Sequence, residues 1–590
     1  MLTESCAVHF LFRQQGLKIQ RSAKGQKELD LNEPSSEMSS QSTIDLTDED
    51  EELRKAITMS QESVTSVETV GFGILGINRK AMEEERLVRN AARIQSTALK
   101  RPRSISPPPL DRPSKTQKTA ARVLATTNVK TQGPLQYPNG VIKKTWSAVH
   151  PRAATDIKIE EVLERDTLRT ALLSAFKWDM DWLFSKLPVP STKLIFVMEA
   201  KNAATRTATR QDAAKYASFL RLCFPPMEGG VNCMHSKLML LFHAHKLRIV
   251  VPSANLVSYD WGETGVMENS VFLIDLPRLS GGEKRGREEM TEFGRNLMFF
   301  LDKSGVDDDV KEGALNFDYE KTKGLAFVCS VGGPSYGDDM PRTGFLGLNK
   351  GVRELGLQTQ DLEIDFAASS IGSLKAEFLD ELYEAATGQA IEKTNAPPAR
   401  KKTKDGITAQ STKIDALERT FRIYFPTHET VASSIGGTEN GGTICHQSQW
   451  WHASSFPRPL FRDYESTRSG LLSHNKLLCA RGWQRLFDLD GEDEGRAVAW
   501  VYTGSANLSA SAWGTRVFDR ARKEWKINCR NWECGVIVPV SVPDSGLDTN
   551  EKVPEMGCFK GVLDVPFVYQ GRQYEGREPW FKPKDRAPDL

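Results

Sequence analysis

One pattern of residues occurs twice in this 590-residue chain, and this repeat constrains the fold more than any other feature. Each copy contains a His-x-Lys triplet, then Ser-Ala-Asn-Leu, then a Trp-Gly pair that begins six positions after the Asn. A single His-x-Lys is common by chance, but two copies with the same downstream segments indicate an internal duplication. The first copy comprises residues 234–238, 252–256 and 261–262, and the second comprises residues 473–477, 504–508 and 513–514.

The segments around each copy favour an α/β fold. Residues 193–199 form a continuous apolar run, which is typical of a strand that is buried on both faces of its sheet. We therefore predict two similar α-β-α sandwich domains, 138–350 and 351–590, which form a pseudo-two-fold pair with the two copies facing each other. We expect strands at 193–199, 237–243, 247–253, 421–425, 474–479 and 497–503, and helices at 157–163, 167–173, 211–222 and 374–386.

Composition narrows the class of protein. The net charge is only +1, so any nucleic-acid binding must depend on a local basic patch. The nine cysteines show no CxxC pair and no zinc-ligand spacing, which favours free thiols in a reducing compartment. No apolar run reaches the roughly 20 residues of a membrane-spanning helix. These features predict an intracellular, soluble protein that has no membrane partner and needs no structural metal.

Residues 1–135 are rich in polar and charged residues and poor in aromatic ones, which predicts a disordered regulatory tail. Within residues 44–62, the first part resembles a SUMO-interacting motif, and a solvated acidic stretch is the alternative. The second part resembles a ubiquitin-interacting motif, because Leu53, Ala56 and Ser60 share one helix face; an ordinary amphipathic helix is the alternative. The basic cluster at 100–118 predicts nuclear import. Residues 388–412 are interpreted as an exposed basic loop.

The repeated residues suit chemistry on a phosphoryl group. Side chains two positions apart on a strand point to the same face, so each triplet presents an imidazole and an ammonium to one site. The ammonium groups and the Asn amides neutralise phosphate oxygens, while one imidazole attacks phosphorus and the other transfers protons. The acid that follows each copy is placed to orient an imidazole. The candidates are His235, Lys237, Asn255 and Glu268 in the first copy, and His474, Lys476, Asn507 and Glu533 in the second.

Paired His-x-Lys triplets with a downstream Asn resemble the phospholipase D superfamily. The usual superfamily motif continues with an Asp five residues after the Lys, where this chain has Phe242 and Arg481. That absence, together with Ser-Ala-Asn-Leu, the Trp-Gly pairs and the segments 179–183 and 369–373, resembles the tyrosyl-DNA phosphodiesterase branch. The resemblance covers roughly residues 138–590 and leaves out the tail.

The resemblance implies that His235 is the nucleophile and His474 the general acid and base. It also implies that the two lysines and two asparagines grip the phosphate, without a metal or other cofactor. The implied substrate is a 3′-phosphotyrosyl bond, left when a type IB topoisomerase stalls on DNA. A tyrosyl oxygen, whose pKa in free tyrosine is about 10, leaves more easily than an aliphatic alcohol. The family also holds DNA with serines and an aromatic residue, which match Ser370, Ser373, Ser509 and Phe176 here.

These observations together predict a nuclear, monomeric DNA-repair phosphodiesterase that removes topoisomerase-derived peptides and other adducts from DNA 3′ ends. Its tail would recruit it to lesions marked by ubiquitin or SUMO. One alternative is another phospholipase D-superfamily hydrolase, either a nuclease or a phospholipase. A second alternative is a non-catalytic DNA-binding adaptor, against which the intact His235 and His474 argue. Some relatives carry an aromatic residue just before the first His-x-Lys, whereas residues 231–234 offer none.

Overall fold

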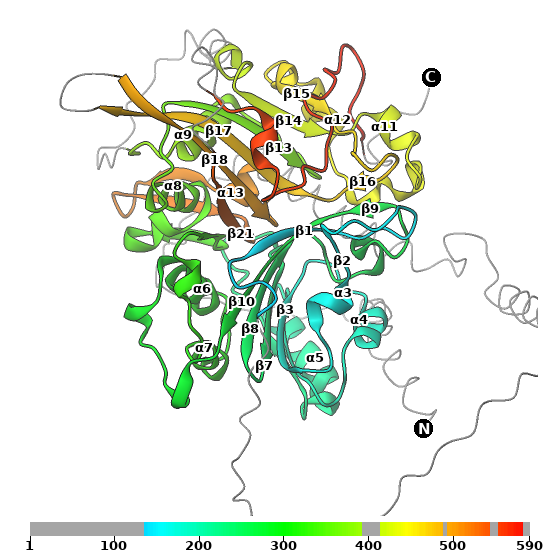
Figure 1. Cartoon of the computed structure of the whole chain (residues 1–590), viewed down its shortest axis with the longest axis vertical. Helices are drawn as coiled ribbons and strands as arrows, with labels where there is room; N and C mark the ends of the chain where they lie inside the picture. Colours follow the sequence, from blue (N-terminus) through cyan, green and yellow to red (C-terminus); the bar gives the residue numbers. More distant parts are fainter. Residues whose placement is uncertain (1–134, 392–413, 488–492, 543–552, 582–590) are drawn as a thin grey trace, which may run out of the picture. The chain divides into compact units, whose positions relative to one another are not determined.

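Two eight-stranded sheets form the framework of the described chain (Figure 1). The computed structural model describes residues 135–391, 414–487, 493–542 and 553–581. The first sheet contains β1 (Val141–Thr145), β2 (Asp156–Ile157), β3 (Leu168–Ser174), β4 (Lys193–Val197), β5 (Leu220–Cys223), β7 (Leu238–His243), β8 (Lys246–Pro252) and β10 (Ser270–Pro277). The second contains β6 (Cys233–Met234), β11 (Ala326–Ser330), β13 (Asp361–Ala368), β14 (Phe421–Phe425), β15 (Phe461–Asp463), β17 (Lys476–Phe487), β18 (Asp493–Gly504) and β21 (Asn531–Val540).

The sheet order repeats between the two halves. The first sheet runs β10-β8-β7-β3-β4-β5, and the second runs β21-β18-β17-β13-β14-β15. Neighbouring strands are antiparallel along the first four strands of each series and parallel along the remaining two pairs. The motif duplication seen in the sequence is therefore a duplication of a whole α/β unit.

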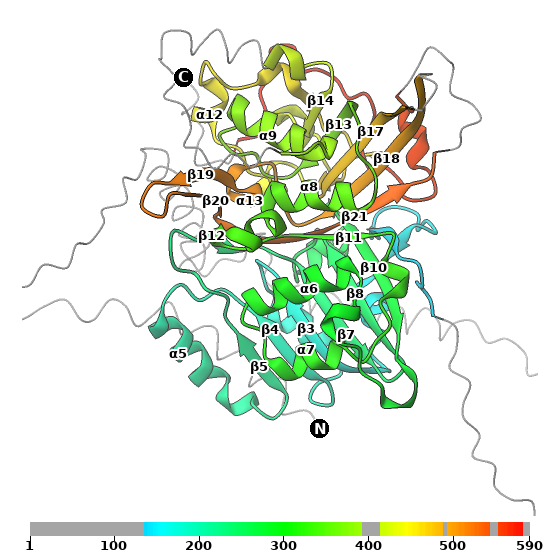
Figure 2. The ribbon, with the colours of Figure 1, turned by 90° about the vertical axis from the view of Figure 1, so that its left-hand side faces the viewer.

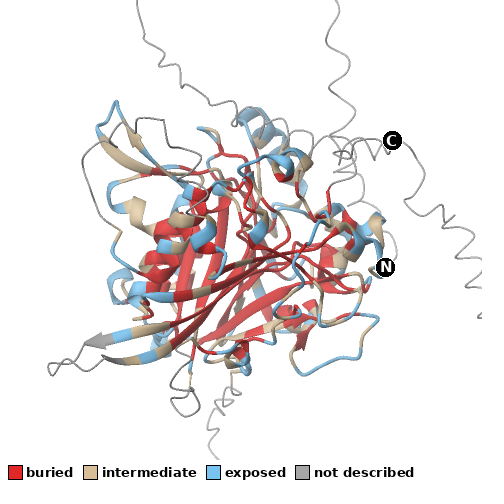
Figure 3. Cartoon of the chain, turned by 90° about the horizontal axis from the view of Figure 1, so that it is seen from above, coloured by how far each residue is buried: buried red, intermediate tan, exposed pale blue. Residues whose placement is uncertain are grey.

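The strands are buried on both faces, which explains their continuous apolar runs. Leu238 and Leu240 of β7 pack into a central core shared by the two sheets, whereas Met239 and Leu241 face a separate core on the outer side. In β17, Leu477 packs into the same central core. Figure 3 shows the strands of both sheets largely buried, whereas the helices expose their outer surfaces. The active-site segments thus emerge from the most rigidly packed part of the fold.

Helices cover the outer face of each sheet. Apolar residues of α3 and α4 pack on the first sheet, and those of α8 and α9 pack on the second (Figures 1 and 2). Apolar residues of α6 and α7 pack into the central core on the inner side, so the arrangement is the predicted pair of α-β-α sandwiches. The helices are α3 (Ile159–Leu163), α4 (Met180–Lys186), α5 (Ala203–Ala213), α6 (Glu292–Lys303), α7 (Asp308–Ala314), α8 (Gly344–Glu354), α9 (Ala376–Thr387), α11 (His428–Ala432), α12 (Ser448–His452) and α13 (Ala510–Trp513).

The two halves exchange short strands next to the repeated motifs. Strand β6, which precedes the first triplet, pairs in parallel with β21 of the second half. Conversely, β16 (Leu472–Ser473), which precedes the second triplet, pairs in parallel with β9 (Met267–Glu268) of the first half. Each triplet is therefore held in place by the other half of the chain.

Most predicted elements are confirmed, and two are wrong. Strands β4, β7, β8 and β14 and helix α9 lie within a few residues of their predicted positions, and β17 and β18 extend beyond theirs. The helix predicted at residues 167–173 is wrong: β3 occupies them, because tertiary burial of Ala171, Leu172 and Leu173 overrides the local periodicity. The helix expected at 211–222 is displaced: α5 ends at Ala213 and β5 begins at Leu220.

The predicted division into domains at residue 350 stays a prediction. Strand β11 precedes that position but belongs to the second sheet, where it pairs with β21. The tail motifs at 44–62 and 100–118, and most of the basic loop at 388–412, lie outside the described residues. None of the described helices is long and apolar enough to cross a membrane.

Candidate active site

The two His-x-Lys triplets occupy matching positions at the ends of central strands. His235 lies between β6 and β7, and His474 lies between β16 and β17. In each triplet the lysine Nζ donates a hydrogen bond to the carbonyl of its own histidine, over 2.8 Å for Lys237 and 2.6 Å for Lys476. Both lysine side chains are fully buried. The duplication therefore extends to individual hydrogen bonds.

The two copies share one electrostatic environment. Burial lowers the pKa of His235, with a smaller lowering contribution from Lys476 of the other copy. Burial also lowers the pKa of His474 to about 4, Lys476 contributes to this lowering, and Lys237 of the other copy adds to it. The exchanged strands hold each triplet against the other half of the chain, and His235 contacts Glu533 of the second half, so the two copies contribute to one site. Burial therefore favours the neutral form of both imidazoles, and the Asp260 carboxylate opposes this by raising the pKa of His474.

Glu533 contacts His235 although it belongs to the other half of the chain, and its expected role in orienting this imidazole stays a prediction. Its Oε2 lies 2.8 Å from Nδ1 of His235 and accepts a hydrogen bond of 2.5 Å from Ser505 Oγ. Its Oε1 accepts a bond of 3.1 Å from Asn531. A carboxylate only accepts, so Nδ1 carries the proton and the lone pair of Nε2 is available for attack. The exchange of β6 onto β21 creates this pairing.

The expectation that Glu268 orients an imidazole needs correction. The Glu268 carboxylate accepts hydrogen bonds from Arg468, at 2.9 and 3.1 Å, and from the Tyr464 hydroxyl at 3.1 Å. A charge-assisted bond to a guanidinium is strong, and it directs this carboxylate away from His474. Glu268 supports the site through its backbone instead, because its carbonyl accepts a bond of 2.9 Å from the His474 backbone N–H.

Asp260 takes the place that was expected for Glu268. Its Oδ2 lies 3.3 Å from Nδ1 of His474 and accepts a bond of 2.7 Å from the Asn255 backbone N–H. Burial alone would raise the pKa of Asp260, but His474 and the Asn255 bond outweigh burial and hold it below its usual value. Asp260 precedes the Trp-Gly pair of the first copy, where the second copy has Ala512. This difference between the copies was the available sequence signal.

Asn255 and Asn507 are fixed in the same way. The Asn255 side-chain oxygen accepts a bond of 3.2 Å from the Lys177 backbone N–H, and that of Asn507 accepts one of 3.0 Å from the Ser370 backbone N–H. Because the oxygen of each amide is bound to the backbone, the NH2 group is directed to donate. The two lysines and the two amides therefore all donate hydrogen bonds to the site, and such a set of donors suits an anion.

The residues expected to hold DNA lie next to this site. The ring of Phe176 is 5.3 Å from the His235 ring, centroid to centroid, and its side chain is 44% exposed. Leu508 accepts a backbone bond of 3.0 Å from Gly372, which brings the segment of Ser370 and Ser373 beside Ser509. Ser509 caps α13, with its hydroxyl accepting from Ala512 N at 3.2 Å. Their roles on DNA stay predictions.

Replacing Asp260 by asparagine is expected to slow catalysis at neutral pH by about ten- to a hundredfold. The carboxylate raises the pKa of His474, so its loss lowers that pKa and reduces the protonated fraction that protonates a leaving group. The defect in kcat/KM should therefore be constant from about pH 5 upwards and shrink as pH falls below about 4. A pH–rate profile measures this. Glu268→Gln, which removes a buried carboxylate bound to Arg468, is the control and should leave the profile unchanged.

The repeated sheet order and the paired His-Lys-Asn sets define a fold of the phospholipase D type. The family model for tyrosyl-DNA phosphodiesterase matches residues 141–575. The chain therefore belongs to the tyrosyl-DNA phosphodiesterase family. This agrees with the resemblance seen in the motifs.

Two kinds of relative agree with this family. Tyrosyl-DNA phosphodiesterase 1 of Arabidopsis thaliana is 22% identical over 431 residues, which are 68% of this chain and 62% of that protein. The chain thus spans less than two thirds of the length of this relative. Crystal structures of yeast tyrosyl-DNA phosphodiesterase with histidine-to-asparagine and histidine-to-arginine substitutions show the same fold. Each has a TM-score of 0.51 and 18% identity, and each match covers 75% of this chain, with 100% and 99% of the respective yeast chains.

Proposed function

We propose that this protein is a DNA-repair phosphodiesterase that hydrolyses 3′-phosphotyrosyl bonds between stalled type IB topoisomerase and DNA. One observation carries this proposal: two fully buried lysines, Lys237 and Lys476, face one site with the imidazoles of His235 and His474. Neither ammonium forms an ion pair within the described part of the chain. Burial lowers the pKa of both lysines, and the nearby carboxylates of Glu533 and Asp260 offset this only in part, so the negative charge of a phosphodiester would stabilise both ammonium groups.

The geometry supports a two-step reaction. In the first step, Nε2 of His235 attacks phosphorus, the bond from phosphorus to the tyrosyl oxygen breaks, and that oxygen takes a proton from His474, which enters this step in its protonated, imidazolium form. In the second, His474 removes a proton from water, which attacks phosphorus, and the P–N bond breaks. DNA with a 3′-phosphate leaves, and His235 is restored. Lys237 and Lys476 stabilise the charge on the non-bridging oxygens in both steps.

The finer parts of the proposal concern partners and place of action. The partner is single-stranded DNA or a DNA 3′ end that bears a topoisomerase-derived peptide, held by Ser370, Ser373, Ser509 and Phe176. We infer that the protein acts as a monomer, because a single chain contains both copies of the site. We also infer that it acts in the nucleus, because the basic cluster at 100–118 predicts nuclear import. Binding of ubiquitin or SUMO by residues 44–62 remains part of this proposal.

The test is cleavage of a single-stranded oligonucleotide that ends in 3′-phosphotyrosine, in the presence of EDTA. We expect release of tyrosine and a 3′-phosphate end, with a rate unchanged by EDTA, because the two lysines supply the positive charge. Analysis of the products on a sequencing gel measures this. A rate that collapses in EDTA and returns with a divalent cation would contradict the phosphohistidine scheme. DNA binding without any release would favour the adaptor alternative, and hydrolysis of phospholipid vesicles alone would favour a phospholipase.

A further inference from the structure

A small three-stranded sheet is inserted next to the active site. It consists of β12 (Gly333–Tyr336), β20 (Glu524–Cys529) and β19 (Thr515–Asp519), in that order. The hairpin formed by β19 and β20 begins directly after the Trp513-Gly514 pair of the second copy and ends just before Glu533. Figure 2 shows this hairpin at the side of the two large sheets. Both ends of the hairpin are therefore attached to segments that build the candidate site.

The hairpin concentrates positive charge. Residues 515–526 contain five cationic and two acidic side chains, a net charge of +3, whereas the whole chain has +1. Arg520 and Lys523, at the exposed tip, form no ion pair within the described part of the chain. Asp519 lies at the base of the turn, and its Oδ1 accepts hydrogen bonds from the backbone N–H groups of Ala521 and Arg522, at 3.0 and 3.1 Å. These bonds fix the backbone of the turn. Lys526 is ion-paired with Asp519 over 3.0 Å and Arg522 with Glu524 over 3.8 Å, so among the described residues Arg520 and Lys523 are the two cations of the turn whose charge is free to bind a ligand.

An aromatic ring lies among these cations. The Arg522 guanidinium lies over the Tyr336 ring, 4.3 Å from its centroid, and the Lys526 ammonium lies 5.6 Å from it. Tyr336 is paired with Lys526 across the strands, and Lys526 with Val517, so the three side chains share one face of the sheet. Val517 is 42% exposed. Cations interleaved with an aromatic and an exposed apolar side chain are typical of a surface for single-stranded nucleic acid.

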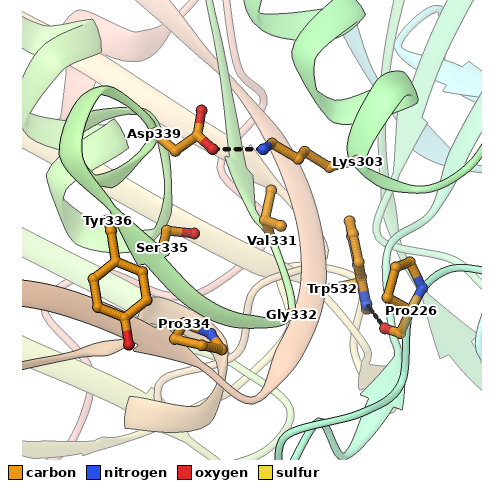
Figure 4. A pocket seen from close by; sticks show the side chains of 9 residues that line it. All are labelled: Pro226, Lys303, Val331, Gly332, Pro334, Ser335, Tyr336, Asp339 and Trp532. Carbon is orange, nitrogen blue, oxygen red and sulfur yellow. Dashed lines mark hydrogen bonds and ion pairs between the residues drawn. The ribbon is translucent and has the colours of Figure 1, made fainter. Parts of the chain in front are cut away.

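A pocket lies beside this sheet, and one of its lining residues contacts the segment of His235. It has a volume of about 280 Å³, and Tyr336, Trp532 and an ion pair between Lys303 and Asp339 line it (Figure 4). The Trp532 indole donates a bond of 3.1 Å to the Pro226 carbonyl, and the Trp532 carbonyl accepts a bond of 3.0 Å from the His235 backbone N–H. One residue, Trp532, thus contacts both the pocket and the segment of the catalytic histidine.

We propose that this hairpin surface, defined as Tyr336, Arg520, Arg522, Lys523 and Lys526, binds the DNA strand on the 5′ side of the nucleotide whose 3′-phosphate is attacked. The inference rests on the proposed function and extends it to a site beyond the catalytic residues. Arg520 and Lys523 contact backbone phosphates, and the Tyr336 ring, which Arg522 flanks, stacks on a base. The strand reaches the surface past Ser509, whose helix α13 leads directly into the hairpin.

The experiment compares two substrates with the same 4-nitrophenyl leaving group, using the full chain. One is thymidine 3′-(4-nitrophenyl phosphate), and the other is a strand of about 20 nucleotides that carries the same group at its 3′ end, long enough to extend beyond the site of a single nucleic-acid-binding module. The test variant is Arg520→Glu with Lys523→Glu. The control is Arg165→Glu with Arg169→Glu, which changes two exposed cations elsewhere by the same total charge. Steady-state KM and kcat are measured over a range of salt concentrations.

The hairpin variant should raise KM for the long strand about tenfold and leave kcat unchanged, while both parameters for the mononucleotide stay as in wild type. The salt dependence of log KM should become shallower by about 0.7 for each phosphate that the variant no longer neutralises. Tyr336→Leu should also raise KM for the long strand, whereas Tyr336→Phe, which keeps the ring, should not. The control should behave as wild type.

Three other results would contradict either the inference or the proposed function, and each has a different meaning. Equal KM values for the long strand in the hairpin variant and the control would overturn the inference while leaving the proposed function intact. A third substrate replaces the 4-nitrophenyl group of the long strand by a tyrosyl peptide, and a defect of the hairpin variant that appears only with this substrate would overturn the inference in favour of a protein-binding surface. If wild type hydrolyses neither substrate, the proposed function itself fails.

Discussion

Replacement of His235 by alanine is expected to reduce turnover of a 3′-phosphotyrosyl oligonucleotide by about 10⁴-fold or more. The substitution removes the nitrogen that bonds to phosphorus, and Glu533 is left with no imidazole to orient. A water molecule would then have to attack without a covalent intermediate. Single-turnover release of tyrosine, followed by quenched flow for wild type and over hours for the variant, measures the effect.

The control for this experiment is His245→Ala, at the turn between β7 and β8 and away from the site. It should retain wild-type turnover. His235→Ala should still bind the oligonucleotide in a fluorescence anisotropy titration, because the lysines and amides remain. If His235→Ala keeps a tenth or more of the wild-type rate, another residue is the nucleophile and the assignment is wrong.

Replacement of His474 by asparagine is expected to trap the protein on DNA. The first step has a good leaving group, a phenol whose ordinary pKa is about 10, so it partly tolerates the loss of the acid. The second step needs a base to activate water, and loss of a general base commonly costs about 10²–10⁴-fold. Breakdown of the phosphohistidine should therefore slow more than its formation. The adduct is measured as a slow-migrating labelled band on a denaturing gel.

The double variant His235→Ala with His474→Asn is the matched control and should give no adduct. The trapped band should also disappear in acid, because a phosphoramidate bond to histidine is acid-labile, whereas a serine or threonine ester is not. If His474→Asn turns over at the wild-type rate with no band, the division of roles between the two histidines is wrong. A band that persists in the double variant would point to a different nucleophile.

The sequence was informative where the relevant signal is local. The repeated triplets and Asn residues identified the same set of groups that the structure brings together, because each copy lies within a short stretch of one strand and loop. The apolar runs at β4, β7, β8 and β14 predicted strands correctly, because burial on both faces leaves a continuous apolar segment. The helix predicted at residues 167–173 was wrong because the periodicity of these residues also suits a helix. Only their pairing with β4 and β7 selects the strand.

By itself, the sequence determined that the chain contains two α/β units with matching His, Lys and Asn residues. Only the tertiary structure decided which acid serves which imidazole. Glu533 is 298 positions from His235 along the chain and meets it because β6 pairs with β21. Glu268 is positioned by a comparable pairing, but Arg468 binds its carboxylate, and Asp260 lies beside His474 instead. The spacing of apolar residues along the chain indicates which segments are buried. The pairing of each acid with an imidazole depends instead on how the two halves exchange strands.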